Sequence, residues 1–433
     1  MRIPIPRVFW IGILASIPVL AGTLTDAFQS MLQNHPQMEA MDARILSRQA
    51  NIEASKSSQL PRVDAHAKYQ LLTEKSRLQM ELPPVAPGMP PIQINRALGD
   101  YDRSEMGITA KYAIFTGFAQ KNMTSSLESS RQALLLERDQ IRNNLALQFG
   151  ILHYATQSAL LEHSLRVRKV QFQESLLKTL EAEFRSGVLT EVQVLSAKAD
   201  LAKVLADTIQ SMRIVDSLRL EFENLTGMPY PSTAQMIVQT LADQVVRILQ
   251  SESLEEQARA VQKSADSKQA SRYPWITTYA SFLLANPGLN QSSNTWMGYG
   301  VFGLQAEWNL FDGFERSHQK KQADADARSL RAEAKRVRSA QELGLRNLGA
   351  EARATAAEAA ALASGTEAAR SARNALQVAV QNGTSTPTDL LLAETRLAEI
   401  ETRIQQLENR VALIHLKSQW LAGHTISFQE THP

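Results

Sequence analysis

The chain repeats itself at a constant displacement of 196 residues. Phe115-Thr116-Gly117-Phe118 returns as Phe311-Asp312-Gly313-Phe314, and Leu225-Thr226-Gly227 falls on Leu421-Ala422-Gly423. The displacement needs no gap over more than a hundred residues. Loops tolerate insertions, so an uninterrupted repeat of this length is not expected of loops. We therefore expect one structural unit written twice, with a rigid, length-critical element in each copy.

The first residues have the pattern of a secretory signal peptide. Arg2 and Arg7 form a basic region, an apolar run follows from Val8 to Leu20, and Val19-Leu20-Ala21 is a small-residue cleavage site. An anchor helix is the alternative, but the run is short for a bilayer and contains Pro18. The prediction is a signal peptide over residues 1–21. The chain has no cysteine, so disulfides, thiolate metal sites and a lipid anchor on an N-terminal cysteine are not expected.

Four segments alternate between apolar and polar residues, at about 62–72, 104–115, 273–284 and 299–311. Val63, Ala65, Ala67, Tyr69 and Leu71 mark one face of the first, and the third is the least regular. A period of two predicts strands with one apolar face. The intervening segments 81–95 and 285–295 contain prolines and glycines and are predicted to be turns.

The apolar faces have two interpretations. They could cover the core of a soluble sheet, or they could face lipid. Strands of about ten residues suit a tilted bilayer crossing. Aromatic residues near the ends of the second pair suggest an interfacial girdle: Trp275, Tyr279, Trp296, Tyr299, Trp308 and Phe311. We favour a membrane barrel. Since the smallest such barrels have about eight strands, this chain must share one with other copies.

Two long helical hairpins are predicted over residues 118–225 and 314–421. Almost no helix breaker interrupts the interval from Phe118 to Gly187, or the matching interval from Phe314 to Gly383. At about 1.5 Å per residue each interval could reach roughly 100 Å as a helix. After each glycine a threonine, Thr190 or Thr386, is placed to cap a returning helix.

The complete expected order is a first repeat over 22–227, a linker at 228–240, a second repeat over 241–423 and a tail at 424–433. A shorter helix opens each repeat, at about 24–58 and about 241–271. Each repeat then continues as strand, loop, strand and helical hairpin. The fold class is a mixed α/β membrane protein with an internal two-fold sequence repeat.

Several chemical signals are set aside. Gly298-Tyr299-Gly300-Val301-Phe302-Gly303 fits a dinucleotide fingerprint but opens a strand instead of a helix. The histidines have no metal-ligand spacing, and the basic run from Lys320 to Arg338 is interleaved with acids, as on a solvated helix face. With a net charge of +2, nucleic-acid binding is not expected. No enzyme activity, metal or cofactor is predicted.

The order of these parts resembles the TolC family of bacterial outer-membrane efflux proteins. The resemblance rests on the signal peptide and on motifs at matching places: Leu24-Thr25-Asp26-Ala27, Asn34-His35-Pro36, Leu60-Pro61, Asn309-Leu310-Phe311-Asp312-Gly313, and Leu-x-Gly at the end of each half. It covers nearly the whole mature chain. It implies a homotrimer that shares a twelve-stranded outer-membrane barrel, continued by a barrel of helical hairpins in the periplasm. A periplasmic adaptor, an inner-membrane transporter and outer-membrane lipid are the implied partners.

The resemblance also implies functional residues at the hairpin tips. Asp389 and Glu191 are the matching acidic positions at the periplasmic entrance. Contact with the adaptor is implied for the turns themselves, at Gly187, Val188, Asn382, Gly383 and Thr384. A second acid and an arginine of the family are replaced here by Leu392 and Ser385, so neither a double acidic ring nor the family's latch can be transferred. An acid in the first turn of a helix also stabilises the helix itself, which is a compatible alternative role.

The predicted function is a passive exit duct of an efflux pump or a type I secretion system. It would extend from the outer membrane into the periplasm, without lipidation. The alternative is a structural periplasmic coiled-coil protein without a transport role. The cargo is not predicted, because drugs, metal ions, lipids and polypeptides could all use such a duct.

Overall fold

The computed structural model describes residues 23–84, 88, 90–98, 100–231, 235–238, 246–290 and 294–431. The predicted signal peptide, residues 1–21, lies outside them. The chain divides into two compact units. One contains residues 1–41, 138–249 and 338–433, and the other contains residues 42–137 and 250–337. We call them the hairpin unit and the sheet unit.

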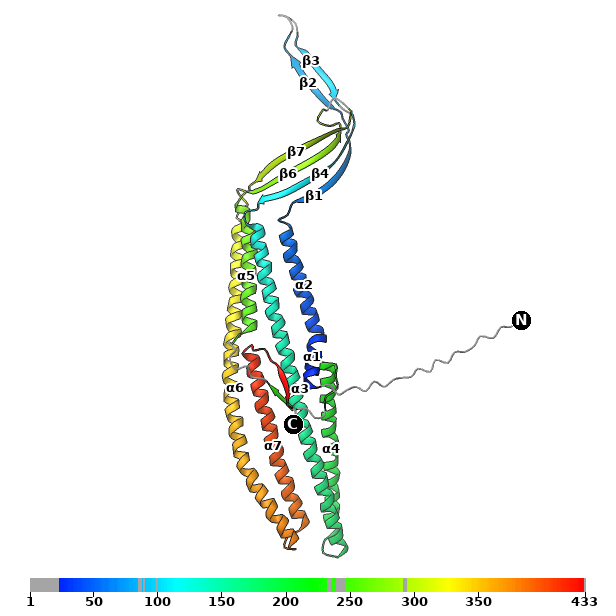
Figure 1. The fold of residues 1–433 in the computed structure, drawn as a ribbon, viewed down its shortest axis with the longest axis vertical. Coiled ribbons are helices and arrows are strands. Elements are labelled where there is room, and N and C mark those ends of the chain that lie inside the picture. The colour runs from blue at the N-terminus through cyan, green and yellow to red at the C-terminus, as the bar shows by residue number, and fades with distance from the viewer. Residues whose placement is uncertain are drawn as a thin grey trace, which may run out of the picture. The chain divides into compact units, whose positions relative to one another are not determined.

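The sheet unit contains an antiparallel sheet with the strand order β1-β4-β6-β7 (Figure 1). The strands are β1 (Arg62–Leu71), β4 (Asp102–Phe115), β6 (Trp275–Asn286) and β7 (Met297–Glu307). β4 belongs to the first sequence repeat and β6 to the second, so the pairing of β4 with β6 joins the two repeats. A hydroxyl–hydroxyl hydrogen bond of 2.9 Å between Thr109 and Ser281 connects the same two strands.

The register places most of the large apolar residues of the four strands on one face. Ala65 pairs with Ile108, Ile108 with Phe282, and Ala280 with Phe302. Directly paired residues of antiparallel strands point to the same side of a sheet. The large side chains of this face are exposed in the single chain: Val63, Tyr69, Leu71, Met106, Ile108, Tyr112, Ile114, Phe282, Phe302 and Leu304. Nothing in the described part of the chain covers these side chains as a core would, which argues against the soluble-sheet interpretation.

Three expectations for the strands were wrong. The girdle was expected on the apolar face of the sheet. The register instead places three of its aromatic residues on the polar face, with Thr277, Ser281 and Gln305: Trp275, Tyr279 and Tyr299. β7 ends at Glu307, so Trp308 and Phe311 follow the strand. The segment 81–95 is not a simple turn, because β2 (Ser76–Leu82) and β3 (Ile92–Leu98) form a hairpin across it.

The long helices are α3 (Ala119–Arg185) and α6 (Glu315–Gln381), each of 67 residues. Their first residues and their last residues are each 196 positions apart, as in the sequence repeat. The returning helices are α4 (Glu191–Thr226) and α7 (Pro387–Leu421). Among the described residues, no helix combines the length and the hydrophobicity that a bilayer crossing requires.

The shorter helices and the linker differ from the prediction. The expected helix over 24–58 is two helices, α1 (Leu24–Asn34) and α2 (Pro36–Ser57), because Pro36 disfavours helical geometry at His35, whose ψ is 127°. Residues 241–245 of the expected helix over 241–271 lie outside the described residues. The described part is α5 (Leu249–Gln269), followed by a short 3₁₀ turn, η1 (Ala270–Arg272). The linker and the tail are not independent, since β5 (Gln235–Val238) pairs with β8 (Phe428–Thr431).

The core of the hairpin unit lies where α1, α3, α4 and β8 meet. Phe149 of α3 is fully buried, and its ring centroid lies 5.3 Å from Phe28, 5.3 Å from Phe222 and 5.2 Å from Phe428. Leu145, Leu416 and Ile426 belong to the same cluster. The aromatic core therefore fixes both ends of the described chain to the middle of the long helix.

His153 lies one turn further along α3 and is 1% exposed. Its Nδ1 is 3.1 Å from the hydroxyl of Tyr230, in the segment that follows α4. Burial lowers the pKa of His153 to about 4, because a charged imidazolium is poorly stabilised away from water. The side chain is therefore neutral in the folded protein at neutral pH.

We expect the stability of the hairpin unit to fall as the pH drops from about 6.5 to about 4. Over this interval the unfolded chain protonates His153 while the folded chain, with its pKa of about 4, does not. Unfolding is therefore favoured, by about 3 kcal/mol in total. Urea unfolding of wild type and His153→Gln at several pH values tests this. The loss should be much smaller in the variant, whereas His415→Gln, at an exposed position, should behave as wild type.

Candidate functional site

The two hairpin tips have the same backbone geometry. Gly187 and Gly383 follow the long helices with φ values of 77° and 71°, a left-handed conformation that glycine adopts without strain. The N–H of Val188 donates to the carbonyl of Glu183 at 3.0 Å, and the N–H of Thr384 donates to Ala379 at 2.9 Å. These bonds satisfy the last carbonyl groups of each helix. The predicted contact residues Gly187, Val188, Asn382, Gly383 and Thr384 are all exposed at these turns.

Asp389 caps the helix that returns from the second tip. Its Oδ2 accepts hydrogen bonds from the hydroxyl of Thr386 at 2.7 Å, the N–H of Thr386 at 3.1 Å and the hydroxyl of Ser385 at 3.0 Å. The donors of Thr386, with that of Ser385, hold the pKa of the Asp389 carboxyl below its usual value. The side chain is exposed. Helix capping is therefore one role of Asp389, and the carboxylate remains charged on the surface.

Ser385 has a role that sequence reasoning missed. Its hydroxyl donates a hydrogen bond to Oδ2 of Asp389. Glu191 occupies the first turn of α4 and is exposed, but the capping box there is made by Thr190 and Gln193. The two predicted acidic positions are therefore held differently, Asp389 by three hydrogen bonds and Glu191 at the surface of the first turn.

The two tips differ in polarity. Four large apolar side chains are exposed around the first tip: Phe184, Val188, Val192 and Leu195. Val188 is 72% exposed. At the displacement of 196 residues, Val188 corresponds to Thr384 and Val192 to Thr388. The first tip thus presents an apolar surface, which we call the tip patch. The turn of the second tip presents hydroxyl groups and the carboxylate of Asp389, with exposed apolar side chains only further along the helices, at Val378 and Leu392.

Four ion pairs join α6 to α7: Arg373–Glu394, Arg370–Glu401, Arg403–Glu358 and Arg410–Glu351. The last two are 2.6 and 3.0 Å long. Their side chains are half-exposed, so each contributes only about 0–1 kcal/mol to stability. Glu351 and Glu358 are seven residues apart, as are Arg403 and Arg410, which is the spacing of a coiled coil. The pairs therefore align the second hairpin more than they stabilise it.

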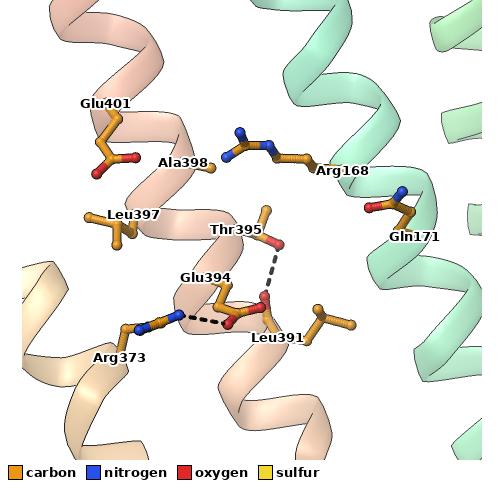
Figure 2. A pocket seen from close by; sticks show the side chains of 9 residues that line it. All are labelled: Arg168, Gln171, Arg373, Leu391, Glu394, Thr395, Leu397, Ala398 and Glu401. Atoms are coloured by element: carbon orange, nitrogen blue, oxygen red, sulfur yellow. Dashed lines mark hydrogen bonds and ion pairs between the residues drawn. The ribbon is translucent and has the colours of Figure 1, made fainter. Parts of the chain in front are cut away.

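A polar cavity of about 320 Å³ lies between α3, α6 and α7. Figure 2 shows Arg168 extending from α3 toward α7, while Arg373 of α6 pairs with Glu394 of α7 at 3.5 Å. Nearby, Lys169 of α3 and Glu399 of α7 form a 2.6 Å ion pair. This charged contact between the hairpins was not predicted. The seven-residue spacing of Glu394 and Glu401 was the available signal.

Within the part of the chain that the structure describes, no three histidine or carboxylate side chains gather as a metal site requires. The arrangement instead combines a sheet with an exposed apolar face and two helical hairpins with unlike tips. The family model of the outer membrane efflux protein matches residues 27–227 and 249–416, most of the chain. The chain belongs to the outer membrane efflux protein family. No curated protein sequence matches it.

Solved structures of similar fold agree with the assignment of this outer membrane efflux protein. CusC, described as forming a transmembrane channel, is 12% identical with a TM-score of 0.71 and coverage of 94% of this chain and 93% of its own. The outer membrane protein VceC of Vibrio cholerae is 17% identical, with a TM-score of 0.69 and coverages of 93% and 96%. The MtrE outer membrane channel of Neisseria gonorrhoeae is 14% identical, with a TM-score of 0.69 and coverages of 93% and 89%.

Family membership settles the general role and location of this protein. It is an outer-membrane exit duct for efflux. The family consists of channel proteins. The apolar sheet face in the sheet unit is the surface suited to lipid, and the hairpin tips are the candidate entrance.

Proposed function

We propose that three copies of this chain form one passive duct, with a shared twelve-stranded barrel in the outer membrane and a periplasmic barrel of helical hairpins. The observation that carries this proposal is the sheet of the sheet unit. Its apolar face is exposed along all four strands, and within the described residues its edge strands β1 and β7 each pair on one side only. Backbone groups at a membrane-embedded edge need partners. Pairing β7 of one copy with β1 of the next supplies them.

The internal two-fold repeat supports a duct whose hairpins reach equal depth. α3 and α6 have the same length, and their tips have the same hydrogen bonds at a displacement of 196 residues. In a trimer the six tips would then form one rim. Three Asp389 carboxylates would line it, and a ring of fixed negative charge raises the local concentration of cations and repels anions.

The adaptor protein of an efflux pump is proposed to dock at the tips. The tip patch on the first hairpin supplies exposed apolar area, which is suited to burial against a partner. The polar second tip, with Asn382, Gly383 and Thr384, is suited to hydrogen bonding. An inner-membrane transporter would supply the energy, because nothing in the duct is proposed to act as an enzyme.

Replacing Asp389 by asparagine tests the entrance ring. Asparagine keeps an oxygen that can accept the capping hydrogen bonds but removes the charge. We expect the preference for cations over anions to fall severalfold, measured as a reversal potential in planar bilayers under a KCl gradient. Thr386→Ala is the matched control, because it removes a capping hydroxyl and keeps the carboxylate.

Thr386→Ala should destabilise the start of α7 by about 1 kcal/mol and leave the reversal potential close to that of wild type. An unchanged reversal potential in Asp389→Asn would reduce Asp389 to a helix cap. Failure of the purified protein to conduct at all would contradict the proposed duct.

A further inference from the structure

The junction between β4 and α3 carries an exposed aromatic cluster. Gly117 and Phe118 both have positive φ values, 60° and 69°. Such a conformation is costly for a phenylalanine, and here it turns the ring of Phe118 to within 5.4 Å of Phe115 and 6.0 Å of Tyr273. Phe118 and Tyr273 are more than half exposed. Phe115 pairs in register with Ile276 of the apolar face, so the cluster continues that face at the end of the strands.

A pocket of about 380 Å³ lies next to this cluster, between the start of α3 and the end of α5. Phe118 and Tyr273 form part of its wall, and three basic residues, Lys121, Lys263 and Arg272, also line it. All three are exposed, and none makes an ion pair with any residue that the structure describes. The pocket therefore joins an aromatic rim to three uncompensated positive charges.

The single acidic residue of the pocket is already neutralised. Asp266 lies 3.0 Å from Nζ of Lys320, on α6, and this hydrogen bond raises the pKa of Lys320. The ion pair therefore offsets much of the negative charge of this carboxylate. A ligand with a positively charged group gains little here, whereas a net anionic ligand meets three cations.

The side chain of Gln269, which lines the pocket, has an oxygen atom that lacks a hydrogen-bond donor. Its Nε2 donates to the carbonyl of Arg316, while its Oε1 is buried without a hydrogen bond. An unsatisfied buried acceptor is unfavourable. Because Gln269 lines the pocket, a rotation of its amide would bring this oxygen to a ligand hydroxyl group.

We propose that this pocket binds the headgroup of an anionic phospholipid with a phosphodiester and free hydroxyl groups, of the phosphatidylglycerol type, from the periplasmic leaflet of the outer membrane. The phosphate would lie among Lys121, Lys263 and Arg272, where charge-assisted hydrogen bonds are strong. The acyl chains would extend along the apolar sheet face. The aromatic cluster would then lie at the level of the lipid–water boundary, where such side chains are favoured.

The matching junction of the second repeat keeps the aromatic pair, with Phe311 and Phe314 at 5.7 Å, but lacks the lysine and the tyrosine. The displacement of 196 residues places Ser317 at the position of Lys121. A proline precedes the first strand of each repeat, Pro61 before β1 and Pro274 before β6. The residue just before this proline is Leu60 in the first repeat and Tyr273 in the second. The charges and the tyrosine thus occur together at one of the two junctions, as expected for a binding site and not for a general property of the strand-to-helix turn.

Native mass spectrometry of the delipidated full-length protein in detergent tests the proposal. Phosphatidylglycerol, phosphatidylcholine or glycerol phosphate is added, and bound ligands are counted per chain. Wild type should bind phosphatidylglycerol more tightly than phosphatidylcholine. Lys121→Gln/Lys263→Gln should weaken phosphatidylglycerol binding roughly 10- to 30-fold, since each lysine near an anionic lipid contributes about 1 kcal/mol, and should leave phosphatidylcholine binding unchanged.

Lys268→Gln/Lys321→Gln is the charge-matched control, because both lysines are exposed on the adjoining helices and do not line the pocket. It should change phosphatidylglycerol binding less than twofold. Equal weakening by both double variants would show diffuse attraction and overturn the pocket. Competition by glycerol phosphate at the concentration of the lipid would show a site for soluble phosphates and overturn the lipid. Because ligands are counted per chain, neither result depends on the proposed trimer or its entrance ring.

Discussion

Phe302→Arg is expected to destabilise the membrane-inserted protein by about 2–4 kcal/mol. Phe302 lies in the middle of β7, is 83% exposed and shares the apolar face with Ala280 and Leu304. In a bilayer this face contacts hydrocarbon, where an arginine is poorly solvated. The measurement is urea unfolding in lipid vesicles, together with the amount of heat-modifiable trimer recovered from outer membranes. Both should fall sharply.

Gln305→Arg provides the matched comparison on the same strand. Gln305 is also exposed but occupies the opposite face, opposite Thr277. It should insert and assemble at nearly the level of wild type. If both variants lost trimer equally, the assignment of the apolar face to lipid would be wrong.

Phe149→Ala is expected to destabilise the hairpin unit by about 3–5 kcal/mol, the usual cost of truncating a fully buried phenylalanine. Its ring contacts Phe28, Phe222 and Phe428, which come from α1, α4 and β8. The cavity should loosen all three elements together. Limited proteolysis should release α1 and the C-terminal segment earlier than in wild type, and thermal unfolding should begin at a lower temperature.

Ile151→Ala, two residues further along α3, is the control for helix propensity and side-chain size. Ile151 is 37% exposed, so its truncation removes little buried area and should cost much less. Similar losses in the two variants would indicate that α3 is not held by the aromatic cluster.

The alternation and repeat in the sequence were sufficient to predict the sheet and the long helices, because each reflects a strong periodicity over many residues. The wrong predictions concern segments where residue type alone suggested one structure and the pairing of strands produced another. Prolines suggested a turn over residues 81–95, yet the strands β2 and β3 extend into that segment from both sides. The prediction of an aromatic girdle was wrong because it counted aromatic residues without asking to which face of the sheet each one points. Three of them lie at odd-numbered positions, which belong to the polar face: Trp275, Tyr279 and Tyr299.

The candidate site was predictable only in part. Thr386 and Asp389 have the spacing of a capping box, so their local contact follows from sequence. The difference in polarity between the tips could be read from the sequence, where Val188 of the first repeat corresponds to Thr384 of the second. That the side chain of Val188 is exposed became known only from the structure. The pocket at the strand-to-helix junction depends on Lys121 and Lys263 approaching from helices more than a hundred residues apart, which no local pattern shows. β5 and β8 pair across a similar separation.

The seven-residue spacing within the second hairpin has a further consequence. If α7 slid along α6 by seven residues, Glu358 could meet Arg410, but Arg403 would meet Gly365 instead of an acid. One of these two pairs would then remain, so the charges oppose such a slide only weakly. The short turn from Asn382 to Thr386 opposes it more strongly, because it leaves no slack for a slide. Lengthening this turn by seven residues should therefore allow a hairpin that keeps part of its ion pairs but ends at a different depth.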